Sequence, residues 1–295
     1  MSPRRCVPRC WLLLLLAVCA CAPHPPPAPP EDQTLVRNTE AGTNALRLDR
    51  PEEATAQFQA ALKQAEARDD LNAIVEISFN LAVAQLRANR PRDALATAER
   101  AQEELARRGA AASSSLRLLE ATALYRTGDP AQADALAAGI EASADVDAAA
   151  GASYLRGLIA DEAGNETGLQ DALGRLSAGG GPVRQADRLE LQARLAIRRN
   201  DYQGARAAAL QAAEIRQTGL DYRGMARALA VAGSAAERSG EAEAAADLYL
   251  RAGRSAAAQS DAATARPWLE QARKLTRDPA TDAAAALALA NLESE

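Results

Sequence analysis

The sequence predicts an all-α fold in which antiparallel helix pairs repeat along the chain as an αα-solenoid. Beyond Glu31 the dominant residues are Ala, Leu, Arg, Glu and Gln, which are strong helix formers. Gly, Asn and Asp recur at regular intervals, where helices would have to stop. One pattern of small residues also returns seven times, which indicates a repeat and not a single compact core.

Residues 1–20 have the pattern of a cleaved export signal. Three arginines and no acidic residue precede the apolar run 11–18, which is shorter than the roughly 20 residues that a membrane-spanning helix needs. The sequence Val-Cys-Ala-Cys at 18–21 resembles a bacterial lipobox, which implies cleavage after Ala20 and lipid attachment at Cys21. Two alternatives stay open, namely cleavage without lipidation and an uncleaved membrane anchor.

Residues 21–30 are predicted to combine the lipid-attachment cysteine with a proline-rich tether. Residues 22–30 read Ala-Pro-His-Pro-Pro-Pro-Ala-Pro-Pro, a composition that favours extended polyproline II structure. At about 3.1 Å per residue this segment would hold the following body roughly 28 Å from the bilayer. We expect it to act as a low-complexity spacer without a recognition role.

The repeat is defined by seven anchor positions and by columns at fixed distances from them. The anchors are Ala54, Ala94, Ala133, Leu169, Ala205, Ala245 and Ala265. Twelve residues earlier stand Gly42, Ala82, Ala121, Gly157, Ala193, Gly233 and Gly253. Five residues earlier stand Asp49, Asn89, Gly128, Gly164, Asn200, Gly240 and Ser260. Four residues later stand Phe58, Ala98, Ala137, Leu173, Ala209, Tyr249 and Leu269.

Each column has a physical reason in a helix–turn–helix unit. Small residues in the first helix and at the anchor let two antiparallel helices approach closely. The turn column falls where the chain must reverse through a left-handed conformation. The anchor and the residue four positions later share one helical face and are buried together. Pro51, Pro91 and Pro130 stand where the second helix would begin, and proline is tolerated in a first turn.

These residues resemble the tetratricopeptide repeat over nearly the whole body, with repeats assigned to 31–276. Good matches are Leu81-Ala82 with Asn89 and Ala94, and Glu120-Ala121 with Tyr125, Gly128 and Ala133. The resemblance implies a right-handed superhelix of roughly fourteen helices. The final anchor spacing is 20 residues, against 36 to 40 elsewhere, which implies that one helix near 242–258 belongs to two pairs. The alternative is an alanine-rich helical bundle with chance matches.

Two segments outside this regular pattern have their own predictions. Asp278-Pro279 reads as an N-cap followed by proline at the first helical position, so 277–295 is predicted to form a C-terminal capping helix. The run Ser-Ala-Gly-Gly-Gly-Pro at 177–182 is the strongest break in the sequence. It is either a hinge or a long loop between repeats, and we favour the loop.

Composition argues against several classes of function. The formal net charge is −5, and removal of the signal with its three arginines would lower it to −8. An acidic chain with 3% aromatic residues lacks the basic stripe and the stacking rings of a nucleic-acid binder. All four cysteines lie at or before Cys21, and the single histidine is His24 in the tether. The body therefore lacks the usual acid–base, thiol and zinc-binding residues, and we expect no enzyme, no cofactor and no metal.

Two columns supply candidate binding residues. In tetratricopeptide repeats the first helices line a concave groove that holds peptides, so the resemblance implies protein partners on that face. Seven residues before the anchors an arginine column predicts affinity for acidic segments, since guanidinium groups bind carboxylates. An apolar column supplies hydrophobic contacts. Both have structural alternatives, namely complementing helix dipoles and burial between repeats. The predicted groove residues are Arg47, Arg87, Arg126, Arg198, Arg238, Phe79, Leu118 and Tyr154.

Together these features predict a lipid-anchored scaffold of the bacterial cell envelope that binds other proteins. The residue after Cys21 is Ala22 and not Asp, which favours the outer membrane, facing the periplasm. Resemblance to envelope lipoproteins with such repeats implies a role in envelope assembly, secretion or pilus biogenesis, or cell-wall enzyme regulation. The alternatives are a soluble periplasmic or secreted adaptor without lipid and, less favoured, a small-ligand binder or enzyme.

Overall fold

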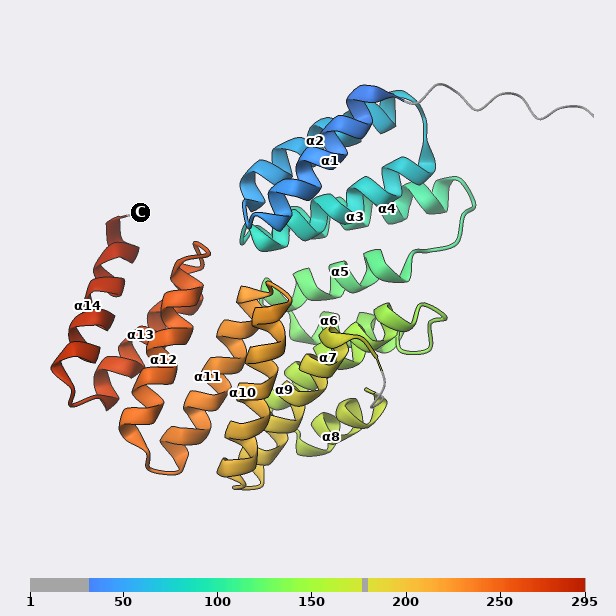
Figure 1. Ribbon diagram of the computed structural model, residues 1–295. Helices are drawn as coiled ribbons and strands as arrows, with labels where there is room; N and C mark the ends of the chain where they lie inside the picture. Colours follow the sequence, from blue (N-terminus) through green and yellow to red (C-terminus); the bar gives the residue numbers. More distant parts are fainter. Residues whose placement is uncertain (1–31, 177–179, 295) are drawn as a thin grey trace, which may run out of the picture. The chain divides into compact units, whose positions relative to one another are not determined.

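The computed structural model describes residues 32–176 and 180–294 (Figure 1). The signal, Cys21 and the tether lie outside these ranges, as does part of the 177–182 break. The description below concerns the compact unit Thr34–Glu295. The described residues form helices α1 (Gln33–Arg47), α2 (Pro51–Ala67), α3 (Leu71–Arg87), α4 (Pro91–Arg107), α5 (Ser114–Arg126), α6 (Pro130–Ala138), α7 (Val146–Glu162), α8 (Glu166–Arg175), α9 (Pro182–Arg198), α10 (Tyr202–Thr218), α11 (Tyr222–Arg238), α12 (Ala242–Ala257), α13 (Ala262–Leu275) and α14 (Pro279–Ser294).

The helices pack in the order of the sequence, which confirms the predicted αα-solenoid. From α2 to α14 each helix contacts the next one along the chain, as Figure 1 shows. The first helices of successive pairs also contact one another, in the pairs α3·α5, α5·α7, α7·α9 and α9·α11. These helices therefore form a layer of their own, and we call its exposed side the first-helix face.

The end of the solenoid follows the predicted change of register. Helix α12 packs closely on both α11 and α13, and it also contacts α14. It is therefore the second helix of one pair and the first helix of the next. The short anchor spacing between Ala245 and Ala265 has this cause, since one helix carries out both roles.

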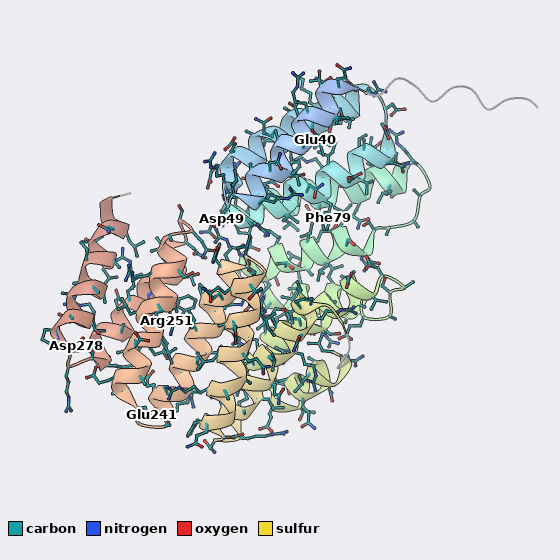
Figure 2. The ribbon with its side chains drawn as sticks, in the orientation of Figure 1. Glu40, Asp49, Phe79, Glu241, Arg251 and Asp278 are labelled. Carbon is teal, nitrogen blue, oxygen red and sulfur yellow. The ribbon has the colours of Figure 1, made fainter. Side chains whose placement is uncertain are left out.

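The turn column adopts the predicted left-handed backbone at every one of its positions. The φ angles include 52° at Asp49, 56° at Asn89 and 84° at Gly240, and Figure 2 labels Asp49 in the α1–α2 turn. Gly128, Gly164, Asn200 and Ser260 share this conformation. Residues Asp69 and Leu220, between repeats, adopt it too, with φ of 56° and 58°. Gly, Asn and Asp reach this region at little cost, and they therefore end the first helices.

The anchors are completely buried, and small residues face them where the paired helices are closest. All seven anchors have 0% of their surface exposed. A Cβ placed on Gly42 would lie 2.8 Å from the ring of Phe58, and one on Gly253 would lie 2.6 Å from the Leu269 side chain. Glycine is therefore required at these two positions by contact with the opposite helix.

Helix starts follow the predicted signals. Pro51, Pro91 and Pro130 each occupy the beginning of a second helix. The carboxylate of Asp278 accepts a hydrogen bond from the Thr281 backbone N–H at 3.0 Å, so it caps α14 at its start (Figure 2). No helix in the described part of the chain is long and apolar enough to cross a bilayer.

Candidate functional site

The largest concentration of charged and aromatic side chains on the first-helix face surrounds a pocket of about 620 Å³, here called the central pocket. Helices α3, α5, α7, α9, α11, α12 and α13 all contribute to its walls. Its main apolar residues are Leu86, Leu118, Tyr154, Leu155, Leu158 and Trp268. Its charged residues are Arg126, Glu162, Arg194, Arg223, Arg227 and Asp261.

A second hollow of about 690 Å³ adjoins the central pocket, and we call it the flanking groove. It runs over α9, α11 and α13 and shares Arg194, Arg227 and Trp268 with the central pocket. The two therefore form one continuous depression on the first-helix face. Its lining also includes Ile197, Arg198, Val231, Ser234, Arg238, Pro267 and Gln271. The acidic residues of the lining are Asp161 and Glu166, which are paired with Arg198 and Arg199.

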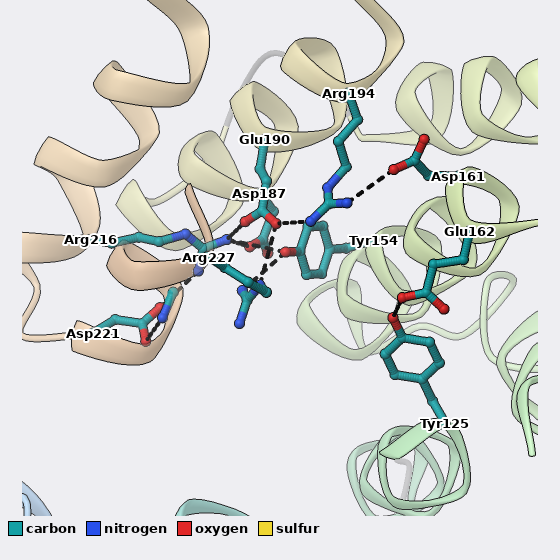
Figure 3. A network of polar contacts seen from close by, with 11 residues as sticks. Tyr125, Tyr154, Asp161, Glu162, Asp187, Glu190, Arg194, Arg216, Asp221 and Arg227 are labelled. Atoms are coloured by element: carbon teal, nitrogen blue, oxygen red, sulfur yellow. Dashed lines mark hydrogen bonds and ion pairs between the residues drawn. The ribbon is translucent and has the colours of Figure 1, made fainter. Parts of the chain in front are cut away.

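A buried cluster of ion pairs, the charge cluster, forms one side of the central pocket (Figure 3). Glu190 on α9 has none of its surface exposed and accepts hydrogen bonds from three arginines. Arg194 and Arg216 each reach it at 3.0 Å, and Arg227 reaches it at 3.3 Å. The other members are Tyr154, Asp161, Asp187 and Asp221.

The cluster joins helices that are distant in sequence. Arg216, at the end of α10, donates to Asp187 on α9 at 2.7 Å and to Asp221, the N-cap of α11, at 2.7 Å. Arg227 on α11 donates to the hydroxyl of Tyr154 on α7 at 3.0 Å. These contacts set the orientation of Arg227 and Tyr154 at the pocket wall, because each side chain has a partner on another helix.

Ionisation in the cluster follows from burial and from the arginines. Burial opposes the charge of Glu190, but Arg227, Arg194 and Arg216 together outweigh it and lower the pKa of this carboxyl below its ordinary value. Burial raises the pKa of Asp187 to about 6, because its attraction to Arg216 is weaker than its desolvation and Glu190 repels it. One carboxylate of the cluster is therefore firmly ionised, whereas the other titrates close to neutral pH.

Three members of the predicted arginine column contact the preceding repeat. Arg87 donates to the carbonyl of Leu46 at 3.2 Å, and Arg126 donates to the carbonyl of Leu86 at 2.6 Å. Arg198 donates to the carboxylate of Asp161 at 2.7 Å and also to its carbonyl. Each of these arginines thus satisfies the C-terminal end of the previous first helix, where a cation also complements the helix dipole.

The predicted site residues are only partly gathered together. Arg126, Leu118 and Tyr154 line the central pocket, and Arg198 and Arg238 line the flanking groove. Arg47 and Arg238 are exposed. Phe79 instead packs between α3, α4 and α5, against Ala98, Ala101, Leu105 and Leu116. Neither hollow includes Arg47, Arg87 or Phe79 among its lining residues.

Several important residues were not predicted from the sequence. Arg223, Arg227, Trp268 and Gln259 lie in the central pocket, but the repeat columns do not mark them. Asp187, Glu190 and Arg194 have the spacing of one helical face, so a charged row on a helix of the repeat core was the available signal. Within the described residues no group of three or more acidic, histidine or cysteine side chains is placed to hold a metal ion.

Comparison with known proteins supports the fold. No protein-family model and no curated protein matches the chain. Among solved structures, a tetratricopeptide repeat protein from Parabacteroides merdae is 16% identical, with coverage of 88% of this chain and 100% of that chain and a TM-score of 0.47. A signal-transduction ATPase with numerous domains and a tetratricopeptide repeat sensor, from Pyrococcus horikoshii, is 15% identical, with a TM-score of 0.50. The match covers 88% of this chain and 42% of the ATPase.

A third similar structure is the TPR2AB domain of yeast Sti1 in a complex with pHSP90. It is 15% identical, the match covers 82% of this chain and 98% of that chain, and the TM-score is 0.33. At these identities the similarity concerns the fold alone. The chain therefore has a helical solenoid of the tetratricopeptide-repeat type, which agrees with its helix order and its repeat columns.

Proposed function

We propose that this protein is a binding scaffold that holds an acidic segment of a partner protein in the flanking groove. The observation that carries the proposal is that the exposed Arg238 lines a groove together with the apolar side chains of Ile197 and Trp268. Arg198 also lines the groove and is paired there with Asp161. Arg238 is exposed and no acidic partner of it is recorded among the described residues, so its guanidinium is free to bind a carboxylate. A helical repeat with such a surface suits the recognition of an extended chain.

Binding is favoured over catalysis by the state of the ionisable groups. The carboxylates and arginines of the charge cluster are engaged with one another, at distances of 2.7 to 3.3 Å. A general acid or base needs to reach a substrate proton directly or through one water molecule. Side chains committed to structural ion pairs serve that purpose poorly, whereas they hold the walls of a binding surface rigid.

In-cell photo-cross-linking tests the proposal. A photoreactive residue would replace Ser234 in the flanking groove, and a matched control would carry it at the exposed Ala283 on α14. Mass spectrometry would identify the segment that is linked from position 234. We expect one acidic segment to be linked from 234 and not from 283. Equal labelling from both positions would contradict a specific site in the groove.

The linked segment then allows a direct measurement of affinity. The variant Arg238→Glu should weaken binding of the synthetic segment by at least about tenfold, since it replaces attraction by repulsion in the groove. Arg251→Glu is the matched control, because Arg251 is exposed on α12 and lies outside both hollows (Figure 2). Unchanged affinity in Arg238→Glu would contradict binding of the segment in the flanking groove.

We also propose that Cys21 carries a lipid and that the scaffold works at the bacterial envelope, on the periplasmic side of the outer membrane. The support is the signal pattern in 1–20, the cysteine and the proline-rich tether. Cys21→Ala should move the protein from the membrane fraction to the soluble fraction and abolish labelling by a radioactive fatty acid. A variant that remains in the membrane fraction would contradict lipid anchoring, and a wild type that is soluble would favour the adaptor without lipid.

A further inference from the structure

The central pocket has features that the proposed partner segment does not use. Arg223 on α11 donates through Nη2 to the backbone carbonyl of Gln259 at 2.9 Å, and the same nitrogen donates to the carbonyl of Arg87. This one side chain joins the end of α3 to the helices α11 and α12. The central pocket lies beside this junction, between α3, α5 and α7 on one side and α11, α12 and α13 on the other.

Two arginines of the pocket lie outside the charge cluster. Arg194 and Arg227 are paired with carboxylates of the cluster, whereas Arg126 and Arg223 are not. The acidic residues of the lining are Glu162, which accepts a hydrogen bond from the Tyr125 hydroxyl, and Asp261, whose Oδ2 lies 3.6 Å from Nη1 of Arg223. Asp261 also caps α13 by accepting from the Thr264 N–H.

The arginines of the pocket lie close enough together to repel one another. Burial lowers the pKa of Arg126, and the neighbouring Arg223 and Arg227 lower it further although Asp261 opposes them. An anion placed between Arg126 and Arg223 would offset this repulsion and raise the pKa of Arg126 again. The pocket is therefore suited to a negatively charged group.

Buried polar atoms beside the pocket indicate where that group would bind. Among the described residues, Nε and Nη1 of Arg223 are buried and donate no hydrogen bond, although Nη1 forms an ion pair with Asp261 at 3.6 Å. Oε1 of Gln259 is likewise buried and accepts none, and this residue is only 8% exposed. The Gln259 amide donates through Nε2 to the Ser255 carbonyl at 2.7 Å, which sets its orientation. These two donors and this acceptor are withdrawn from water, and they belong to two residues that the hydrogen bond from Nη2 of Arg223 to the Gln259 carbonyl joins directly.

We propose that the central pocket binds a small amphiphilic carboxylate. Its carboxylate accepts hydrogen bonds from Arg223 and lies against Arg126, and a donor next to the carboxylate bonds Oε1 of Gln259. Its apolar body packs on Leu118, Leu158 and Trp268. An N-acyl amino acid has this chemistry, because an amide N–H stands beside its carboxylate. The volume of about 620 Å³ is in the range of small-molecule sites, which is roughly 300 to 1,000 Å³.

Fluorescence of Trp268 gives a direct test in the full-length chain. The chain has two tryptophans, so Trp11→Phe leaves Trp268 as the only one. N-decanoylglycine would be titrated below its micelle concentration, with its methyl ester as the neutral control. We expect a saturable change in Trp268 fluorescence with the acid and at least about tenfold weaker binding of the ester. Equal binding of both, or no saturable change, would overturn the proposal.

Two protein variants examine the assigned contacts. Gln259→Met should weaken binding of N-decanoylglycine but leave binding of decanoate unchanged, since decanoate lacks the amide donor. Arg251→Met, outside the pocket, should bind both as the wild type does. Circular dichroism would verify that Gln259→Met keeps its helices, and the ester comparison needs no substitution in the pocket. Loss of affinity for decanoate as well as for the acylglycine would contradict the assigned contact.

The proposal does not rest on the partner segment in the flanking groove. A terminally blocked Asp-Leu peptide would be titrated in the same assay as a further probe. Binding of this peptide without binding of N-decanoylglycine would overturn the small-molecule assignment. Binding of N-decanoylglycine in the Arg238→Glu variant would support the pocket independently of the groove.

Discussion

At the scale of single residues, the size of one side chain decides the size of its counterpart. In four repeats the residue four positions after the anchor is large, namely Phe58, Leu173, Tyr249 or Leu269. In each of these repeats the residue twelve positions before the anchor is glycine. Where the later position is Ala98, Ala137 or Ala209, the earlier one is alanine. The Cβ distances at Gly42, Gly233 and Gly253 give the physical reason in three of these four pairs, because the large side chain occupies the space of the missing methyl group. At Gly157 the side chain in that space is Leu191, on α9 of the next repeat, and not Leu173.

This complementarity predicts a specific loss of stability in Gly42→Ala. The added methyl group would lie 2.8 Å from the ring of Phe58, so the free energy of unfolding should fall by about 1–3 kcal/mol in urea titrations. Gly174→Ala in α8 is the matched control, because no atom lies within 4 Å of its added Cβ. That variant should be neutral or more stable by up to ~1 kcal/mol.

A double variant distinguishes a steric clash from a change in helix propensity. Phe58→Ala alone should cost about 3–5 kcal/mol, because it leaves a cavity. In Phe58→Ala with Gly42→Ala the total loss should be smaller than the sum of the two, since the clash is gone. Strict additivity would contradict direct contact between the two positions.

At the scale of helices, the arginine column acts as a link between consecutive repeats. Arg87 and Arg126 each donate to the last turn of the previous first helix. The arginine is the second donor to each carbonyl, since Leu46 also accepts from the Asp49 N–H at 3.3 Å and Leu86 from the Asn89 N–H at 3.2 Å. Arg198 makes a similar contact with Asp161, so three members of the column link consecutive first helices. Ligand binding by the column stays a prediction.

The link predicts that substitutions at different positions of the arginine column lower stability by different amounts. Arg126→Met should lower the free energy of unfolding by about 2 kcal/mol, since it removes hydrogen bonds of a charged donor to Leu86 and Asn89. Arg47→Met, at the exposed first position of the column, should change it by less than about 0.5 kcal/mol. Thermal unfolding of both variants compares them, and an equal effect would contradict the proposed link.

At the scale of the whole molecule, the charge cluster connects helices that local sequence does not relate. Its acidic members respond to pH in opposite directions. The pKa of Asp187 is raised from 3.8 to about 6, so the folded protein binds this proton more tightly than the unfolded chain does. Its ionisation lowers stability as the pH rises from about 4 to about 6, by at most about 3 kcal/mol. Glu190 has a lowered pKa and stabilises the fold once the pH exceeds its ordinary value.

Replacing each carboxyl by the amide of the same shape should distinguish the effects of Asp187 and Glu190 on stability. Asp187→Asn cannot ionise, so its melting temperature should fall less than that of the wild type between about pH 4 and pH 6. Glu190→Gln should lose about 3–5 kcal/mol at neutral pH, because the buried Arg216 and the partly buried Arg194 and Arg227 then lack their common carboxylate. Melting curves across this pH range check both, and identical pH profiles for Asp187→Asn and wild type would contradict the raised pKa.

The repeat and its turns were predictable because they depend on neighbours close in sequence. Asp49 and Asn89 mark turns by their own backbone preferences, and the spacing of Ala245 and Ala265 revealed the shared helix. The central pocket was not predictable in the same way. The contact of Arg227 with Tyr154 joins residues 73 positions apart, and it depends on how successive pairs accumulate their rotation. No single column of the repeat predicts the total rotation between distant helix pairs.

Hydrogen exchange with the bound partner segment is the most direct test of the claim that the first-helix face is the binding surface. Exchange would be measured for the full chain with and without the segment that is cross-linked from position 234. The account predicts slower exchange in α9, α11 and α13, which line the flanking groove, and unchanged exchange in α2, α4 and α10. Protection confined to those second helices or to α14 would contradict it.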